Sequence, residues 1–167
     1  MLSFVSSFDA FDAFARLLMQ DNGVFDEINP PALGAPQGFT HGLVVPPGCS
    51  LLFVAGQTAA SASGEVADHS FESQFASALD KVLAVVRAAG GTAEHIVRMT
   101  VFVTDIDAYR TSRGRLKAVW RDRMGRHYPA MALVAVTPRV DARATVEIEA
   151  TAAIPSDAAS RPITNAQ

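Results

Sequence analysis

The chain has 167 residues, of which 49% are hydrophobic and 19% charged, so it holds enough apolar material for one sizeable core. A formal net charge of −3 argues against nucleic acid as a partner, because broad binding to a phosphate backbone requires clustered lysine and arginine. Cys49 is the only cysteine, which excludes an internal disulfide. With no basic leader and no run of 18 apolar residues, we expect a cytoplasmic protein that makes no membrane contact.

The first predicted element is a short amphipathic helix over residues 8–20, where phenylalanines recur every third residue. A helix this short must dock to be stable, either as a packing arm on its own subunit or across a neighbour or a pocket. We therefore assign residues 1–28 to an N-terminal helical extension. A loop rich in proline and glycine follows over residues 29–38.

The remaining pattern predicts one domain over residues 29–154 and a loose tail over residues 155–167. Within the domain, strands are predicted over residues 39–45, 51–57, 98–104, 131–136 and 144–153, and helices over residues 74–89 and 107–124. Glycines follow both helices and end them. This order of elements predicts an α+β fold in which two helices pack on one face of a single sheet.

Glu147 stands in the last strand, where apolar and polar residues alternate. Val146 and Ile148 share one face of that strand, while Glu147 and Glu149 share the other. Two carboxylates on one face are typical of a solvated surface. The alternative is a face that lines a subunit interface or a pocket, where a carboxylate transfers protons.

Five segments favour the second alternative, because they occur together in a known order: residues 51–58, 74–91, 99–105, 128–130 and 146–150. They include Gly56-Gln57 at a strand end and the Tyr128-Pro129-Ala130 turn. Together they resemble the RidA family (reactive intermediate deaminase, formerly YjgF) over roughly residues 29–154. The resemblance implies a chorismate-mutase-like subunit that assembles as a homotrimer with pockets between subunits.

The resemblance also assigns roles to individual residues. Glu147 matches the glutamate that orients the hydrolytic water or moves a proton, which a partly buried carboxyl group can do. Gly56 and Gln57 match a strand end whose backbone contacts the ligand, although a strand end can need glycine for geometry alone. Phe39 stands where the family has a tyrosine, as a pocket wall or as plain core.

Met131 is the main departure from the family pattern. The deaminating members carry an arginine there, which holds the carboxylate of a 2-imino acid. A charge-assisted pair of this kind contributes about 1.5–3 kcal/mol, and methionine cannot replace it. Arg113, near a family asparagine, and Arg139, before the last strand, could supply a cation. The other interpretation is that they belong to a solvated cationic surface.

These observations predict a cofactor-free hydrolytic deaminase, or a related hydrolase, acting on a reactive enamine or imine. The substrate would differ from the usual 2-imino acids and could be an aminomuconate-type intermediate of aromatic breakdown. Loss of chemistry, leaving a trimer that binds or regulates through a small molecule, is the alternative. A ribonuclease is less consistent with the negative net charge of the chain. The four histidines lack metal-ligand spacing, so no metal is expected.

Overall fold

The computed structural model describes residues 24–66, 70–137 and 143–156. The helix predicted over residues 8–20 and residues 157–167 of the predicted tail lie outside this range, as does Arg139. The part that is described contains every strand and helix predicted for the domain, with one strand much shorter than expected.

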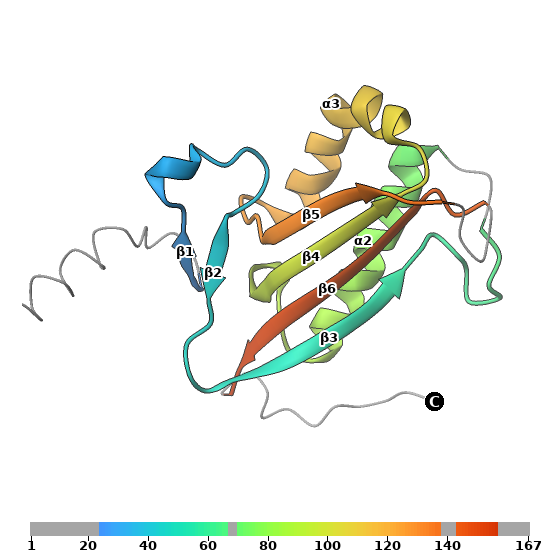
Figure 1. Cartoon of the computed structure of the whole chain (residues 1–167). Helices are drawn as coiled ribbons and strands as arrows, with labels where there is room; N and C mark the ends of the chain where they lie inside the picture. The colour runs from blue at the N-terminus through green and yellow to red at the C-terminus, as the bar shows by residue number, and fades with distance from the viewer. Residues whose placement is uncertain (1–23, 67–69, 138–142, 157–167) are drawn as a thin grey trace, which may run out of the picture.

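A four-stranded sheet forms the centre of the molecule, in the order β3 (Cys49–Gln57), β6 (Val146–Pro155), β4 (Ile96–Val103) and β5 (Ala130–Ala135). Strand β6 pairs antiparallel with β3 and β4, and β4 pairs parallel with β5. Figure 1 shows α2 (Phe71–Ala88) and α3 (Ile106–Met124) together behind one face of this sheet. The predicted α+β arrangement is confirmed.

Both helices begin and end where the sequence places capping residues. Ser70 accepts a hydrogen bond from the Ser73 N–H at the start of α2, and Gly90 follows the helix with a φ of 84°. Asp105 accepts hydrogen bonds from two N–H groups at the start of α3, and Gly125 ends that helix with a φ of 62°. These caps fix the lengths of the two elements that cover the sheet.

The core lies between the helices and the sheet. Its fully buried side chains include Leu79 and Leu83 of α2, Val101 of β4 and Ile148 of β6. Among the described residues, no helix lies over the opposite face of the sheet (Figure 1). The alternation predicted for the last strand is confirmed, because Val146, Ile148, Ala150 and Ala152 are buried.

Two ion pairs hold α3 against α2. Arg123 makes two hydrogen bonds of 2.8 Å to Asp80, and Arg115 lies 2.5 Å from Glu72. Hydrogen bonds from its own backbone N–H, from the Ser112 hydroxyl and from Arg115 lower the pKa of Glu72 to about 2. This pairing shows that arginines of α3 serve the contact between the helices.

The strand predicted over residues 39–45 is wrong in extent, and it does not belong to the single sheet that was predicted. Only β2 (Gly42–Val44) is extended, and it pairs with β1 (Asp26–Ile28) in a separate two-stranded sheet. Thr40 is instead held to the turn before β5, through its N–H to Pro129 O at 3.2 Å and its hydroxyl to Tyr128 O at 2.7 Å. These long-range bonds override the local strand propensity. Short 3-10 helices, η1 (Pro31–Leu33) and η2 (Ala93–His95), complete the described elements.

Candidate functional site

Glu147 lies on the face of the sheet that the helices leave uncovered. It is partly buried and stands opposite Phe102 of β4. Its carboxyl group lies over the backbone of Gly56 on β3: a Cβ built on Gly56 would fall 1.7 Å from Glu147 Oε1 and 2.6 Å from Cδ. Glycine at position 56 is therefore what allows the carboxyl group to occupy this place.

An irregularity in β3 creates that close approach. The register between β3 and β6 shifts between Val54 and Gln57, which is typical of a β-bulge. Gln57 donates from Nε2 to Ala55 O at 3.1 Å, across the irregular segment. Lys81 of α2 then donates to Thr58 O at 2.8 Å and also to Ala60 O, so the chain beyond the bulge is fixed from the helix side.

Gln74 of α2 fixes the segment that leads into β6. It is 3% exposed, donates to Arg143 O at 3.0 Å and accepts from the Thr145 N–H at 2.9 Å. These bonds hold the segment that enters β6 immediately before Glu147. The position of the carboxyl group is thus set by contacts from α2 as well as by the sheet.

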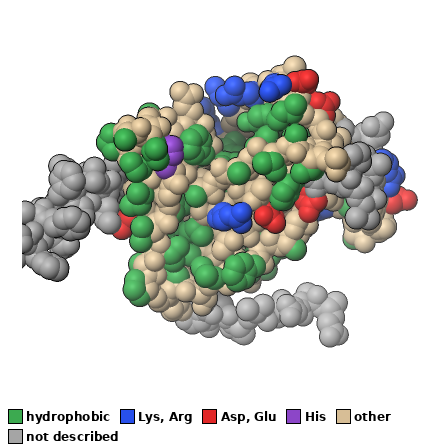
Figure 2. Space-filling view, viewed as in Figure 1, with side chains coloured by type: hydrophobic (Ala, Val, Ile, Leu, Met, Phe, Trp, Pro, Cys, Tyr) green, Lys and Arg blue, Asp and Glu red, His purple; other side chains and the backbone are tan. Residues whose placement is uncertain are grey.

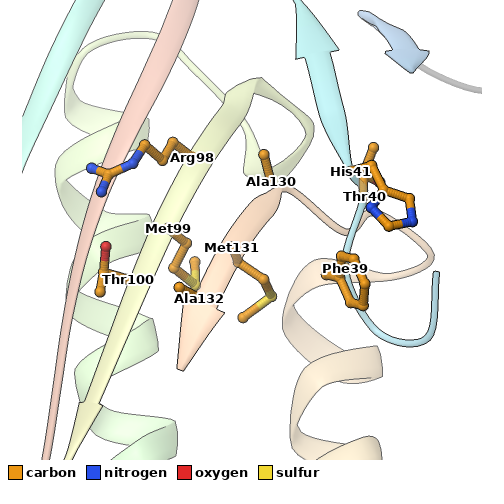
Figure 3. A pocket seen from close by; sticks show the side chains of 9 residues that line it. All are labelled: Phe39, Thr40, His41, Arg98, Met99, Thr100, Ala130, Met131 and Ala132. Atoms are coloured by element: carbon orange, nitrogen blue, oxygen red, sulfur yellow. The ribbon is translucent and has the colours of Figure 1, made fainter. Parts of the chain in front are cut away.

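A hollow of about 310 Å³ lies at the end of the sheet where β5 begins. Phe39 and Met131 both line it, and Figure 3 shows the Met131 side chain extending from β5 toward the Phe39 ring. The Phe39 ring also contacts His41 edge-on, with ring centres 5.1 Å apart. The full lining is Phe39, Thr40, His41, Arg98, Met99, Thr100, Ala130, Met131 and Ala132.

The sequence analysis missed the polar members of this lining. Arg98 and Thr100 stand opposite Ala130 and Ala132 of β5, whose methyl groups leave the space open. Arg98 Nη1 lies 3.8 Å from Glu149 Oε1, and both side chains are largely exposed. The alternation of β4 could have indicated them, because Arg98 and Thr100 interrupt an otherwise apolar strand.

The predicted site residues therefore fall into separate groups. Glu147, Gly56 and Gln57 lie together, whereas Phe39 and Met131 lie in the hollow. Glu149 pairs with Thr100, which lines the hollow. Glu147 is two residues away from Glu149 along β6, a distance of about 7 Å along the strand. The set is not united in one cavity of a single subunit.

Arg113 does not line the hollow. It is exposed on α3, on the helix side of the sheet, among other arginines of that helix. Its position agrees with the interpretation as part of a solvated cationic surface. Arg139 lies outside the described residues. Arg98 is the one arginine among the described residues that line the hollow, and Figure 3 shows its guanidinium extending away from Met131 and Phe39.

The uncovered face of the sheet is strongly apolar around these groups. Phe53 is 76% exposed, Leu51 57% and Val134 41%. Figure 2 shows hydrophobic side chains spread over this face, with basic and acidic side chains side by side near its middle. An exposed apolar surface of this kind is typical of a protein contact.

Residues 24–66, 70–137 and 143–156 contain no group of three or more His, Cys, Asp or Glu side chains arranged to hold a metal ion. Neither helix in these ranges combines the length and the hydropathy needed to cross a bilayer.

Solved structures similar to this chain include three from bacteria. A Rid-family protein of unknown function from Yersinia pestis, YyfB, is 26% identical, covers 77% of this chain and 97% of its own, and has a TM-score of 0.65. The YjgF gene product of E. coli is 29% identical, with coverage of 81% and 95% and a TM-score of 0.54. E. coli TdcF with bound serine is 30% identical, with coverage of 71% and 90% and a TM-score of 0.54.

No curated protein matches the chain. The profile of the family described as "Endoribonuclease L-PSP" matches residues 29–154, which is most of the sequence. The resemblance inferred from five short segments is thereby confirmed. This chain belongs to the endoribonuclease L-PSP family, which includes the RidA and YjgF proteins.

Proposed function

We propose that this protein is a cofactor-free hydrolytic deaminase, or a related hydrolase, that acts on a reactive enamine or imine. The observation that carries the proposal is the Glu147 carboxyl group held over Gly56, partly buried on the uncovered sheet face. Hydrolysis of an enamine requires a proton on carbon and a water molecule at the resulting electrophilic carbon. A positioned carboxyl group gives its proton to carbon and then takes one from the attacking water. It returns that proton to nitrogen, so that the C–N bond breaks and ammonia leaves.

The site that we propose is completed between subunits of a homotrimer. Glu147 and Gly56 form one half, and the hollow lined by Phe39 and Met131 forms the other. The exposed apolar side chains of the uncovered face, among them Phe53 and Leu51, supply a surface for that assembly. The separation of the two halves within one chain supports a site shared by neighbours.

The lining of the hollow supports a substrate other than the usual 2-imino acids. Met131 and Phe39 present a thioether and an aromatic ring, which offer apolar contact without a charge. TdcF, at 30% identity, binds serine, so an amino-acid-derived ligand is known for one similar structure. We propose that this chain accepts a larger and less polar relative of such ligands, such as an aminomuconate-type compound.

Ammonia release from freshly generated substrates tests the proposal. The panel contains 2-imino acids, an aminomuconate-type enamine and uncharged enamines, each assayed with the wild type, Glu147→Gln and the exposed control Glu94→Gln. We expect turnover of a member outside the 2-imino acids. Loss of a general acid–base group should reduce that turnover by about 100-fold or more in Glu147→Gln, while Glu94→Gln should match the wild type.

Each other outcome contradicts a stated part of the proposal. Rapid turnover of ordinary 2-imino acids would contradict our interpretation of Met131. Release of ammonia that Glu147→Gln leaves unchanged would contradict the role of Glu147. No release from any member would refute the deaminase and favour a trimer that binds a small molecule without chemistry.

The family description makes ribonuclease activity the second candidate. The net charge of −3 argues against it, because binding to a nucleic acid depends on Lys and Arg neutralising phosphates. Cleavage of RNA that falls steeply with salt would support the nuclease.

A further inference from the structure

The two-stranded ribbon formed by β1 and β2 has an apolar side. Asp26 pairs with Val44, and Ile28, two residues along the same strand, lies on the same side. Val44 is 45% exposed, Ile28 is partly exposed, and Gly42, opposite Ile28, adds no side chain that could cover them. Because a ribbon of two short strands is marginally stable by itself, a further contact on this side would stabilise it.

Exposed apolar residues also flank β1 along the chain. Val24, immediately before the strand, is 41% exposed, and Leu33 of η1, beyond its end, is 63% exposed. Figure 1 shows β1, β2 and η1 together at one side of the molecule, and the ribbon is a sheet of its own. This surface therefore differs from the face of the four-stranded sheet with Phe53 and Leu51, which the proposed trimer covers.

A segment with an apolar stripe precedes this surface in the sequence, within residues 1–23, which lie outside the described part of the chain. Its apolar residues recur at helical spacing: Phe8, Phe11, Phe14 and Leu18. On a helix this stripe spans about 15 Å, since each residue rises 1.5 Å. A helix over residues 8–20 is too short to be stable in water by itself, so the stripe requires an apolar partner.

The connection between this segment and the ribbon is short. Residues 21–23 alone separate the predicted helix from Val24, so the Cα atoms of Gln20 and Val24 lie at most about 14 Å apart. Asn22-Gly23 within the connection is a turn signal, which lets the chain reverse its direction. A helix that reverses there runs back along β1 and reaches the apolar side of the ribbon.

We propose that residues 8–20 form a helix that packs on the apolar side of the β1–β2 ribbon of the same subunit. The stripe of phenylalanines covers Ile28 and Val44, and the opposite side of the helix, which carries Asp9 and Asp12, faces water. This contact does not depend on the proposed reaction.

The packed helix would also fix one wall of the hollow. Asn29, directly after β1, accepts a hydrogen bond from the His41 N–H at 2.9 Å and donates one to Glu27 of β1 at 3.1 Å. His41 and its near neighbour Phe39 both line the hollow. A contact that stabilises the ribbon therefore stabilises the residues that form this wall.

Amide hydrogen exchange of the full chain, followed by mass spectrometry, tests the contact. In the wild type, residues 8–20 should exchange at least about tenfold more slowly than an unfolded chain of the same sequence. Phe11→Asp combined with Phe14→Asp should abolish this protection and speed the exchange of β1 and β2 at least about threefold. Asp9→Ser combined with Asp12→Ser is the matched control, because it has the same spacing on the polar side, and it should behave as the wild type.

Val44→Asp tests the same contact from the ribbon. It places a charge against the stripe and should abolish the protection of residues 8–20. Its control is Val85→Asp, at a 36% exposed valine of α2, which should keep that protection. Trp120 is the only tryptophan, is 7% exposed and stacks on Tyr128, so unchanged tryptophan emission shows that the domain remains folded in both variants.

Exchange of residues 8–20 at the rate of an unfolded chain in the wild type would overturn the proposal. Protection that persists in a folded Val44→Asp protein would also overturn it, because the segment would then pack elsewhere. The variant with both phenylalanines replaced leaves the residues of the ribbon intact, so it decides the question even if Val44→Asp unfolds the domain.

Refolding isotopically labelled Val44→Asp chains with an excess of unlabelled Phe11→Asp, Phe14→Asp chains tests which subunit supplies the ribbon. We expect the labelled residues 8–20 to stay unprotected. Protection regained in the labelled segment would mean that it packs on the intact ribbon of another subunit, which contradicts the proposal.

Discussion

Replacing Gly56 by alanine should disable Glu147 without unfolding the protein. The added Cβ would fall 1.7 Å from Glu147 Oε1. An unstrained contact between non-bonded heavy atoms lies near about 3.5 Å, so the carboxyl oxygen must move by about 2 Å. A displacement of about 1 Å at a catalytic group can reduce turnover by about 100-fold, and we expect at least that loss.

The stability of Gly56→Ala should change little. Gly56 is not among the described glycines with positive φ, so alanine can adopt its backbone conformation. Alanine also has less conformational freedom than glycine in the unfolded chain, which favours the folded state. The Glu147 side chain is partly exposed and can rotate away from the new methyl group. We expect the free energy of unfolding in urea to stay within about 1 kcal/mol of the wild type.

Gly114→Ala is the matched control, because a Cβ on that glycine of α3 meets no atom within 4 Å. It should keep full turnover and gain about 0.5–1 kcal/mol of helix stability. The assay is ammonia release on the substrate identified with the wild type. A double variant with Glu147→Gln should lose no more than Glu147→Gln alone, because both changes act on one carboxyl group. Full turnover by Gly56→Ala, or losses that add, would refute the reasoning.

Three further predictions follow from other contacts. Met131→Arg should raise kcat/KM for 2-imino acids by about 10- to 100-fold, since it restores a charge-assisted pair; no gain in a steady-state assay would show that the hollow does not receive these substrates. The pKa of Glu72 is lowered from 4.5 to about 2, so its carboxylate stabilises the fold above pH 4.5 and loses that effect as pH falls toward 2. Glu72→Gln should therefore flatten the pH dependence of urea unfolding in that window, and a curve parallel to that of the wild type would contradict the assignment. Gln74→Leu removes the hydrogen bonds to Arg143 O and from Thr145 N–H, which should cost about 1–3 kcal/mol in urea unfolding; an unchanged midpoint would mean that other groups hold the entry to β6.

Local patterns in the sequence were sufficient for the layers of the fold. The alternation around Glu147 predicted β6 and its buried face, because a strand directs successive side chains to opposite sides. Apolar residues at helical spacing, followed by glycines that end a helix, predicted α2 and α3. The strand predicted over residues 39–45 failed because Thr40 bonds to Tyr128 and Pro129, which are remote in sequence.

The sequence by itself determined which chemical groups this protein has, among them a carboxylate at Glu147 and a thioether at Met131. Only the tertiary structure decided which groups meet. The bulge in β3 brings Gly56 under Glu147, and the parallel pairing of β4 with β5 places Arg98 beside the hollow that Met131 lines. Both contacts depend on strand register, which is set by pairing between segments that are distant in the sequence.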